Sequence, residues 1–160
     1  MTLTVERLHE VMNYDPLTGQ FSWRVRLSNR APAGSLCTNK DRHGYIRVRI
    51  DGQLYWAARL AWFYVHGRWP PNDIDHIDGT RDNNAITNLR EATRSQNLSN
   101  RKPGRAFKGA YYNRRQNRWH SAICVNRVSH YLGMFKTEQE AHQAYAAASA
   151  EHHGQFARVK

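Results

Sequence analysis

The spacing of hydrophobic residues changes repeatedly along this chain, and each change predicts an element. Leu8, Val11 and Met12 recur with a helical period after Thr4, a residue type that caps helices. The run 14–19 contains Asp, Pro and Gly at positions typical of turns. The chain is therefore predicted to begin with a short capped helix that ends before this turn.

Strand-type patterns follow the turn. Residues 21–24 predict a strand, residues 28–44 are rich in Gly, Asn, Ser and Pro and predict a loop, and residues 45–50 alternate apolar with basic side chains. Asp51-Gly52 is typical of a tight hairpin turn. A return strand is expected over 53–56.

The middle of the chain is less regular. A short buried helix is expected over 59–66, ending at Gly67, whereas the polar residues 72–92 predict a loop-rich segment. Thr93-Arg94-Ser95-Gln96 has the spacing of a capping box, which predicts a helix up to about Asn100.

The last third has its own pattern. Pro and Gly in 102–106 predict a linker, and residues 107–160 predict a second module. Its expected strands are 109–113, 118–125 and 129–134. Thr137 and Glu140 form a second capping box, which predicts a helix that ends at Gly154.

Composition narrows the class of protein. No apolar run approaches the roughly 20 residues that a membrane span needs, and no signal segment is evident, so a cytoplasmic protein without a membrane partner is expected. Cys37 and Cys124 lie far apart, which favours two partly buried thiols over a disulfide framework or a thiolate zinc site.

Charge points to a polyanionic partner. The chain has 24 Lys and Arg against 13 Asp and Glu, a net charge of +11. No acidic residue lies between Glu91 and Glu138, a stretch that is rich in Arg and also holds Tyr and Trp side chains. A solvated basic face is the alternative, but the one-signed, aromatic-containing stretch favours nucleic acid binding.

Polar side chains with hydrolytic chemistry gather after residue 72. Asp75 and His76 place a ligand for a hard cation beside a general base, and the amide oxygen of Asn97 offers a further ligand. Oxygen ligands favour Mg²⁺ or Mn²⁺ over Zn²⁺, so no structural zinc is expected. A carbonyl such as that of Asn88 would fix the tautomer of His76. Turn chemistry is the alternative, and it remains the interpretation of Asp78, Asp82, Asn83 and Asn84.

The runs 75–90 and 93–97 closely resemble the HNH homing-type endonucleases of phages and mobile introns, and 14–19 with Gly44-Tyr45 is similar to the segment that often precedes the motif. The resemblance implies a ββα-metal fold with four site residues. Asp75 and Asn97 would be metal ligands, His76 the general base and Asn88 the residue that orients it. Arg90 or Arg94 would contact the scissile phosphate, or be a solvated charge. Many relatives have His where this chain has Ala58, which puts a supporting contact in doubt.

The second module resembles the plant ethylene-response-factor (Apetala-type) DNA-binding domain over residues 107–159, chiefly through Tyr131-Leu132-Gly133-Met134-Phe135 and the capped Ala-rich helix. That family lays a three-stranded sheet in the major groove. Together with the linker, the resemblance implies these DNA contacts: Arg101, Lys102, Arg114, Arg115, Arg118, Trp119, Arg127 and Tyr131. The aromatic members have sheet packing as their alternative role.

The expected fold is α+β: an N-terminal β-rich extension (1–71), an HNH core (72–101), the linker (102–106) and the DNA-binding module (107–160). The expected function is metal-dependent hydrolysis of duplex DNA by a monomer or a homodimer. Two alternatives stay open. A DNA-binding regulator would keep the HNH module only as scaffold, and an RNA-binding protein would rest on charge alone.

Overall fold

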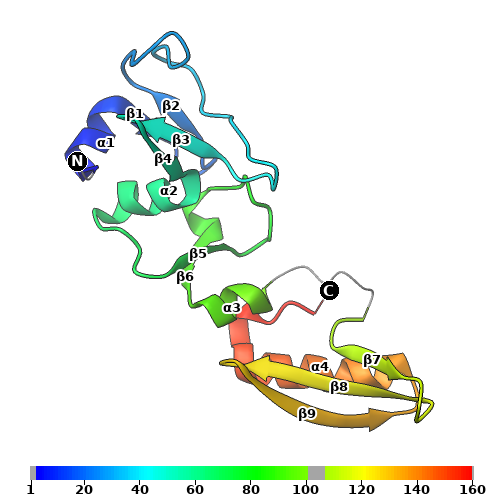
Figure 1. The fold of residues 1–160 in the computed structure, drawn as a ribbon. Coiled ribbons are helices and arrows are strands. Elements are labelled where there is room, and N and C mark those ends of the chain that lie inside the picture. Colours follow the sequence, from blue (N-terminus) through cyan, green and yellow to red (C-terminus); the bar gives the residue numbers. More distant parts are fainter. Residues whose placement is uncertain (1–2, 101–106, 160) are drawn as a thin grey trace. The chain divides into compact units, whose positions relative to one another are not determined.

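The computed structural model describes residues 3–100 and 107–159, and the chain divides into two compact units, Met1–Glu91 and Ala92–Lys160 (Figure 1). Each unit is described by itself below. Helices and small antiparallel sheets alternate along the chain, which confirms the α+β class. Over the described ranges, every helix is too short or too polar to cross a membrane.

The first unit begins as the hydrophobic spacing predicts. Helix α1 spans Val5–Val11, and the Thr4 side chain accepts a hydrogen bond from the backbone N–H of Arg7, 3.2 Å away. Strands β1 (Met12–Tyr14) and β2 (Phe21–Trp23) pair antiparallel across the turn-forming run.

The predicted hairpin and buried helix are both confirmed. Strands β3 (Arg47–Ile50) and β4 (Gln53–Trp56) pair antiparallel, and Asp51-Gly52 joins them with a positive φ at both residues. This is the backbone that a tight hairpin turn requires. Helix α2 (Ala57–His66) then ends at a left-handed glycine, as predicted.

The expectation of a loop-rich segment over 72–92 is wrong for two parts of it. Strand β5 (Asp73–His76) and strand β6 (Leu89–Ala92) form a two-stranded sheet, and the 3₁₀ helix η1 (Ile86–Asn88) precedes β6. The polar pattern hides the strands because β5 buries polar side chains at its end and satisfies them with partners from other parts of the unit, a compensation that periodicity cannot reveal.

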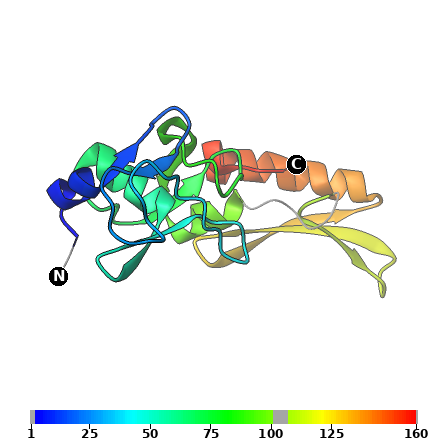
Figure 2. The same ribbon diagram turned by 90° about the horizontal axis from the view of Figure 1, so that it is seen from above.

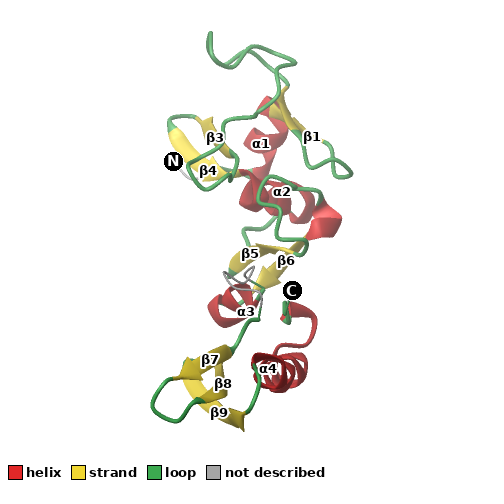
Figure 3. Cartoon of the chain, turned by 90° about the vertical axis from the view of Figure 1, so that its right-hand side faces the viewer, coloured by secondary structure: helices red, strands yellow, loops and turns green. Residues whose placement is uncertain are grey.

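One apolar core supports the whole first unit. Buried side chains from α1, β1–β3 and α2 form a single cluster, Leu89 of β6 joins it, and the half-buried Tyr55 of β4 packs against it. Figure 3 shows α1 and α2 beside the β3–β4 hairpin. Strand β6 is thus fixed to the core, and β5 is fixed to β6.

The second unit has both capping boxes in the predicted places. Helix α3 spans Arg94–Ser99 and helix α4 spans Glu138–His153. Strands β7 (Ala110–Asn113), β8 (Arg118–Val125) and β9 (Val128–Phe135) form an antiparallel sheet in that order, and η2 (Gly154–Phe156) follows α4. The three strands and the helix are those that the sequence predicts.

Helix α4 runs along one face of this sheet (Figure 2). The core between them is small, with Ile123 of β8 packed against Tyr145 and Ala148 of α4. Because side chains alternate along a strand, Cys124 points to the other face. The expectation of a partly buried thiol is therefore wrong for Cys124, which is exposed, and it holds for Cys37, which is half-buried.

Candidate active site at the end of strand β5

The predicted metal ligand Asp75 is buried at the end of β5. Its side chain is only 5% exposed and forms an ion pair with Arg90 of the neighbouring strand β6, whose Nε and Nη2 both lie 2.8 Å from Oδ2. A buried carboxylate needs such a partner, because an unpaired charge in the interior is strongly unfavourable. The pair explains how a polar residue can end a strand that packs into the fold.

The predicted base, His76, is also buried and is held by a residue that the sequence assigns to a turn. The Nε2 atom of His76 lies 3.1 Å from Oδ1 of Asn84, and Nδ2 of Asn84 donates to the carbonyl oxygen of Asp82. With the amide oriented in this way, Oδ1 is an acceptor, so Nε2 carries the proton and the lone pair is on Nδ1. This is the neutral tautomer in which Nδ1 can accept a proton.

The surroundings of His76 favour the uncharged ring. Burial lowers the pKa of His76 below its ordinary value, and it outweighs the hydrogen bond to Asn84 and the negative charges of Asp78 and Asp75, which act in the opposite direction. A general base must be deprotonated to act. The site therefore keeps His76 in the form that its predicted role requires.

Asn88, predicted to orient His76, fixes the loop that follows it. The side chain of Asn88 accepts a hydrogen bond from the N–H of Asp78 and donates to its carboxylate, both over 3.0 Å, while the N–H of Ile77 donates to the Asn88 carbonyl. Burial alone would raise the pKa of Asp78, but hydrogen bonds from Asn83, Asn88 and Thr80 lower it overall. The orienting role of Asn88 stays a prediction, and Asn84 is the partner of His76 that sequence reasoning missed.

The turn-forming run 14–19 lies against the segment that holds His76. The hydroxyl of Tyr14 donates to the Asn84 carbonyl over 2.7 Å, and the N–H of Ile86 donates to the Pro16 carbonyl over 3.0 Å. Gly19 has a φ of +72°, and a Cβ added there would lie 2.2 Å from backbone atoms of Asn84 and Ala85. Only glycine permits so close an approach. The turn therefore fixes Asn84, and Asn84 fixes His76.

Arg59, which follows the divergent position Ala58, anchors the segment before β5. Its guanidinium donates to the carbonyl oxygens of Asn72 and Pro70 over 2.8 and 2.9 Å. Ala58 itself is buried in the core of the unit. The divergence from the resemblance thus falls on a position that packs apolar surface.

Asn97, the second predicted metal ligand, lies in the second unit and is half-buried on α3. Its N–H donates to the Thr93 carbonyl, so the capping box sets its place in the first turn. The donor chemistry of the predicted pair fits Mg²⁺, which prefers carboxylate and amide oxygens and commonly keeps water and substrate phosphates as its other ligands. Among the residues that the structure describes, no three His, Cys, Asp or Glu side chains lie close enough to hold a metal ion together.

The predicted DNA contacts of the second unit spread along β8. Arg114 and Arg115 are exposed in the β7–β8 turn, Arg118 is exposed at the start of β8, and Arg127 is exposed in the β8–β9 turn. Arg94 is exposed on α3. Arg101, Lys102 and the linker 102–106 lie outside the described residues.

The two predicted aromatic contacts lie on opposite faces of the sheet. Tyr131 is 65% exposed and pairs with Ala122, on the face away from α4. Trp119 is half-buried and alternates with Ser121 and Ile123, which places it on the α4 side beside Tyr112, with ring centroids 5.2 Å apart. Tyr131 therefore projects into solvent, whereas Trp119 packs on the α4 side.

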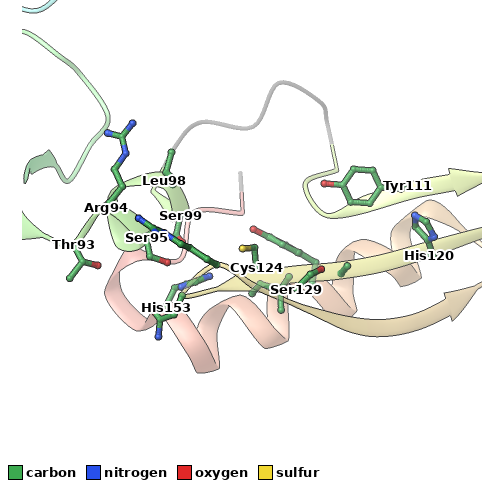
Figure 4. A pocket seen from close by; sticks show the side chains of 15 residues that line it. Thr93, Arg94, Ser95, Leu98, Ser99, Tyr111, His120, Cys124, Ser129 and His153 are labelled. Carbon is green, nitrogen blue, oxygen red and sulfur yellow. The ribbon is translucent and has the colours of Figure 1, made fainter.

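A hollow of about 830 Å³ lies within the second unit (Figure 4). Arg94 of α3 and Arg127 both line it, together with Tyr111, His120 and the Cys124 thiol. It therefore brings two of the predicted phosphate-binding arginines to one concavity.

Comparison with known proteins identifies the segment that carries the buried Asp-His pair. Residues 55–99 match the family model described as HNH endonuclease. The uncharacterized HNH endonuclease L560 of Acanthamoeba polyphaga mimivirus is 35% identical over 89 residues, 54% of this chain, and the chain spans about half (47%) of that relative's length.

A solved structure, titled as DNA binding and cleavage by the HNH homing endonuclease I-HmuI, is also similar, with 16% identity and a TM-score of 0.45 over 96% of this chain and 91% of that one. The match to the family model includes Asp75, His76 and Asn88. The two sequence matches support a nuclease of the HNH type.

Proposed function

We propose that the protein is a metal-dependent endonuclease that hydrolyses phosphodiester bonds of duplex DNA. The observation that carries the proposal is the buried Asp75-His76 pair at the end of β5, with Arg90 on the carboxylate and Asn84 on the imidazole, inside the stretch that matches the HNH endonuclease model. A buried base with a set tautomer beside a buried carboxylate is costly to keep without a chemical use.

His76 is the proposed general base. Its Nδ1 takes a proton from the water that attacks the phosphorus, while Nε2 stays hydrogen-bonded to Asn84. Holding the ring through the far nitrogen keeps Nδ1 aimed at one point, and lost orientation typically costs about 10²-fold in rate. Asn84 is accordingly a positioning residue.

Asp75 and Asn97 are the proposed ligands of one Mg²⁺ or Mn²⁺ ion, which when bound supplies positive charge to the phosphate and to the departing oxygen. Arg90 holds the Asp75 carboxylate in place. Either Arg90 or Arg94 is the proposed contact to the scissile phosphate. Asn88 keeps the loop after His76 in shape through Asp78.

The second unit is proposed to supply affinity and placement on DNA, in the manner of the ethylene-response-factor domain that it resembles. Its exposed arginines match the charge of phosphates, and Tyr131 adds contact area. The proposed class is a homing or phage-type nuclease acting in the cytoplasm as a monomer or a homodimer. A monomer with one active centre would nick, whereas a symmetric dimer would cut both strands.

A cleavage assay tests the proposal. Supercoiled plasmid and a random-sequence duplex library are incubated with the purified protein in Mg²⁺, in Mn²⁺ and in EDTA. We expect cleavage only with a metal ion, and a loss of about 10²–10⁴-fold in His76→Ala because general base catalysis contributes that much. Asn84→Ala is expected to lose about 10–100-fold, the loss typical when the hydrogen-bond partner of a metal-bound imidazole is removed.

His66→Ala is the matched control, because His66 is exposed at the end of α2 in the same unit and is expected to leave the rate unchanged. Protein that leaves every DNA intact with both ions, while it binds duplex equally with and without metal, would instead be the non-catalytic regulator. If His76→Ala cleaves DNA at the rate of the wild type, His76 is not the general base.

A further inference from the structure

The outward face of the β3–β4 hairpin combines guanidinium groups with exposed apolar side chains. Val48 and Ile50 of β3 point into the core, so the alternate residues point outward. Cross-strand pairing places Arg47 opposite Trp56 and Arg49 opposite Leu54. We call these four residues, with Tyr45 and Arg81, the hairpin face.

A continuous row of rings and cations connects the hairpin face to His76. Arg47 lies over the Trp56 ring at 5.7 Å, and Tyr45 meets Trp56 edge-on with centroids 5.6 Å apart. Tyr45 in turn lies 6.0 Å from the His76 ring, and Arg81 lies over Tyr45 at 5.2 Å. The face therefore leads directly from the hairpin to the proposed base.

Two polar contacts hold the loop that carries Tyr45 against the polar loop after β5. Arg81 donates to the His43 carbonyl over 2.7 Å, and Lys40 forms an ion pair with Asp82 over 2.6 Å. Contacts between these two loops therefore fix the position of Tyr45 beside His76. The apolar core does not require it, because Tyr45 is only half-buried.

The charge around this face is predominantly positive, with Asp41 bonded to the N–H of Tyr45 and Asp82 paired with Lys40. Between Asp41 and Asp73 the only acidic residue is Asp51, and Arg7 donates to both of its carboxylate oxygens, which lowers the pKa of Asp51. Five arginines lie in the same stretch: Arg42, Arg47, Arg49, Arg59 and Arg68. A basic surface with an exposed Trp matches a sugar–phosphate backbone better than it matches a mixed-charge protein surface.

We infer that the hairpin face is a second DNA-contacting surface, which holds the duplex next to the phosphate presented to His76. This inference rests on the proposed function and assigns a role to the extension before the HNH segment. Arg47 and Arg49 neutralise phosphates, and Trp56 packs against the sugars between them. Tyr45 fixes the end of the row beside His76, so DNA held on the face enters the site in one register.

Equilibrium binding measurements separate the phosphate contacts of the two arginines from the packing of Trp56 against the sugars. His76→Ala protein in EDTA is titrated against a labelled duplex over a range of salt concentrations, so that no cleavage intervenes. Arg47→Gln with Arg49→Gln is expected to reduce the slope of log affinity against log salt by about 1.8, since each lost phosphate contact removes about 0.9. Trp56→Ala is expected to weaken binding about 3- to 30-fold with an unchanged slope, because it removes contact area and no charge.

Matched controls are available in the same unit. Val65 on α2 is as exposed as Trp56 (45% against 43%), so Val65→Ala controls for the loss of an exposed apolar side chain. Arg26→Gln with Arg30→Gln removes two exposed charges from another loop. Both controls are expected to bind as the parent does, and thermal melts of every variant check that the unit stays folded.

The possible outcomes decide the inference separately from the proposed function. Plasmid cleavage by the wild type with unaltered binding by both hairpin variants overturns the hairpin face but not the nuclease. Weakened binding by both variants in a protein that cleaves nothing keeps the face and overturns the nuclease. An equal change of the salt slope in the Arg26 and Arg30 control would show that the arginines act only through non-specific charge, which overturns the hairpin face. Duplex RNA that competes as well as DNA overturns the assignment to DNA. If Trp56→Ala unfolds, Trp56→Leu and the double arginine variant decide the test.

Discussion

The two units differ in the size of the apolar core that supports their candidate functional residues. Among the residues that the structure describes, sixteen buried hydrophobic residues form the core cluster of the first unit, whereas three form that of the second. A close-packed core resists displacement of the groups built on it. The first unit is suited to holding His76 and Asp75 to a fraction of an ångström, and the second to presenting long basic side chains, whose proposed phosphate contacts would tolerate movement.

The largest expected effect comes from one added methyl group beneath the site of the first unit. Gly19→Ala would place a Cβ 2.2 Å from the backbone of Asn84 and Ala85, which cannot move aside as a flexible side chain can. We expect a loss of about 3 kcal/mol in unfolding free energy. Cleavage should also be lost, because Asn84 holds His76. Urea unfolding and the plasmid assay measure the two effects.

Gly34→Ala is the matched control for this change. Gly34 also has a positive φ, +80° against +72°, but an added Cβ meets nothing within 4 Å. The strain of a left-handed alanine is thus common to both variants, and the collision belongs to Gly19 alone. Equal behaviour of the two variants would show that the contact between the turn and Asn84 is unimportant.

A glycine-to-alanine change in the small core should destabilise the second unit and leave the first unit folded. A Cβ on Gly109, where φ is +79°, would lie 2.1 Å from the ring of Tyr145 in the small core. We expect a loss of about 1–3 kcal/mol, less than for Gly19 because a side chain can partly adjust. DNA affinity should fall while the first unit keeps its melting transition. Gly154→Ala has open space and serves as control.

Sequence alone predicts the elements whose signals are local. Both capping boxes, the Asp51-Gly52 turn and the end of α2 at Gly67 depend on residues within a few positions of one another, and all four are confirmed. The neutralisation of Asp75 by Arg90 joins residues fifteen apart, and the Tyr14 bond to Asn84 joins residues seventy apart. Such partners leave no periodic signal, so strands β5 and β6 resembled a polar loop.

The candidate site shows the same division between features with a local sequence signal and features that depend on distant partners. The identities of Asp75 and His76 follow from the chemistry of hydrolysis and from a family resemblance, because both depend on short motifs. Asn84 was assigned to turn chemistry, since an Asn-Asn pair is common in turns. Its second use, as the partner of a buried imidazole, depends on burial, which composition does not report.

The smallest expected effect is a pH dependence of the stability of the second unit. His153 is buried at the end of α4, and burial lowers its pKa, with the charges of His152 and Lys108 acting in the same direction. The folded state therefore favours the neutral ring, and the unfolded state binds a proton first as the pH falls below about 6.5. Stability is fully present above that pH and decreases below it.

We expect the melting temperature of the second unit to fall by a few degrees between pH 7.5 and pH 5.5, and His153→Gln to reduce this fall. His130→Gln is the control, because His130 is exposed on β9. Calorimetry at several pH values follows the transition. An identical pH dependence in His153→Gln and the parent protein would show that the burial of His153 does not affect the stability of the second unit.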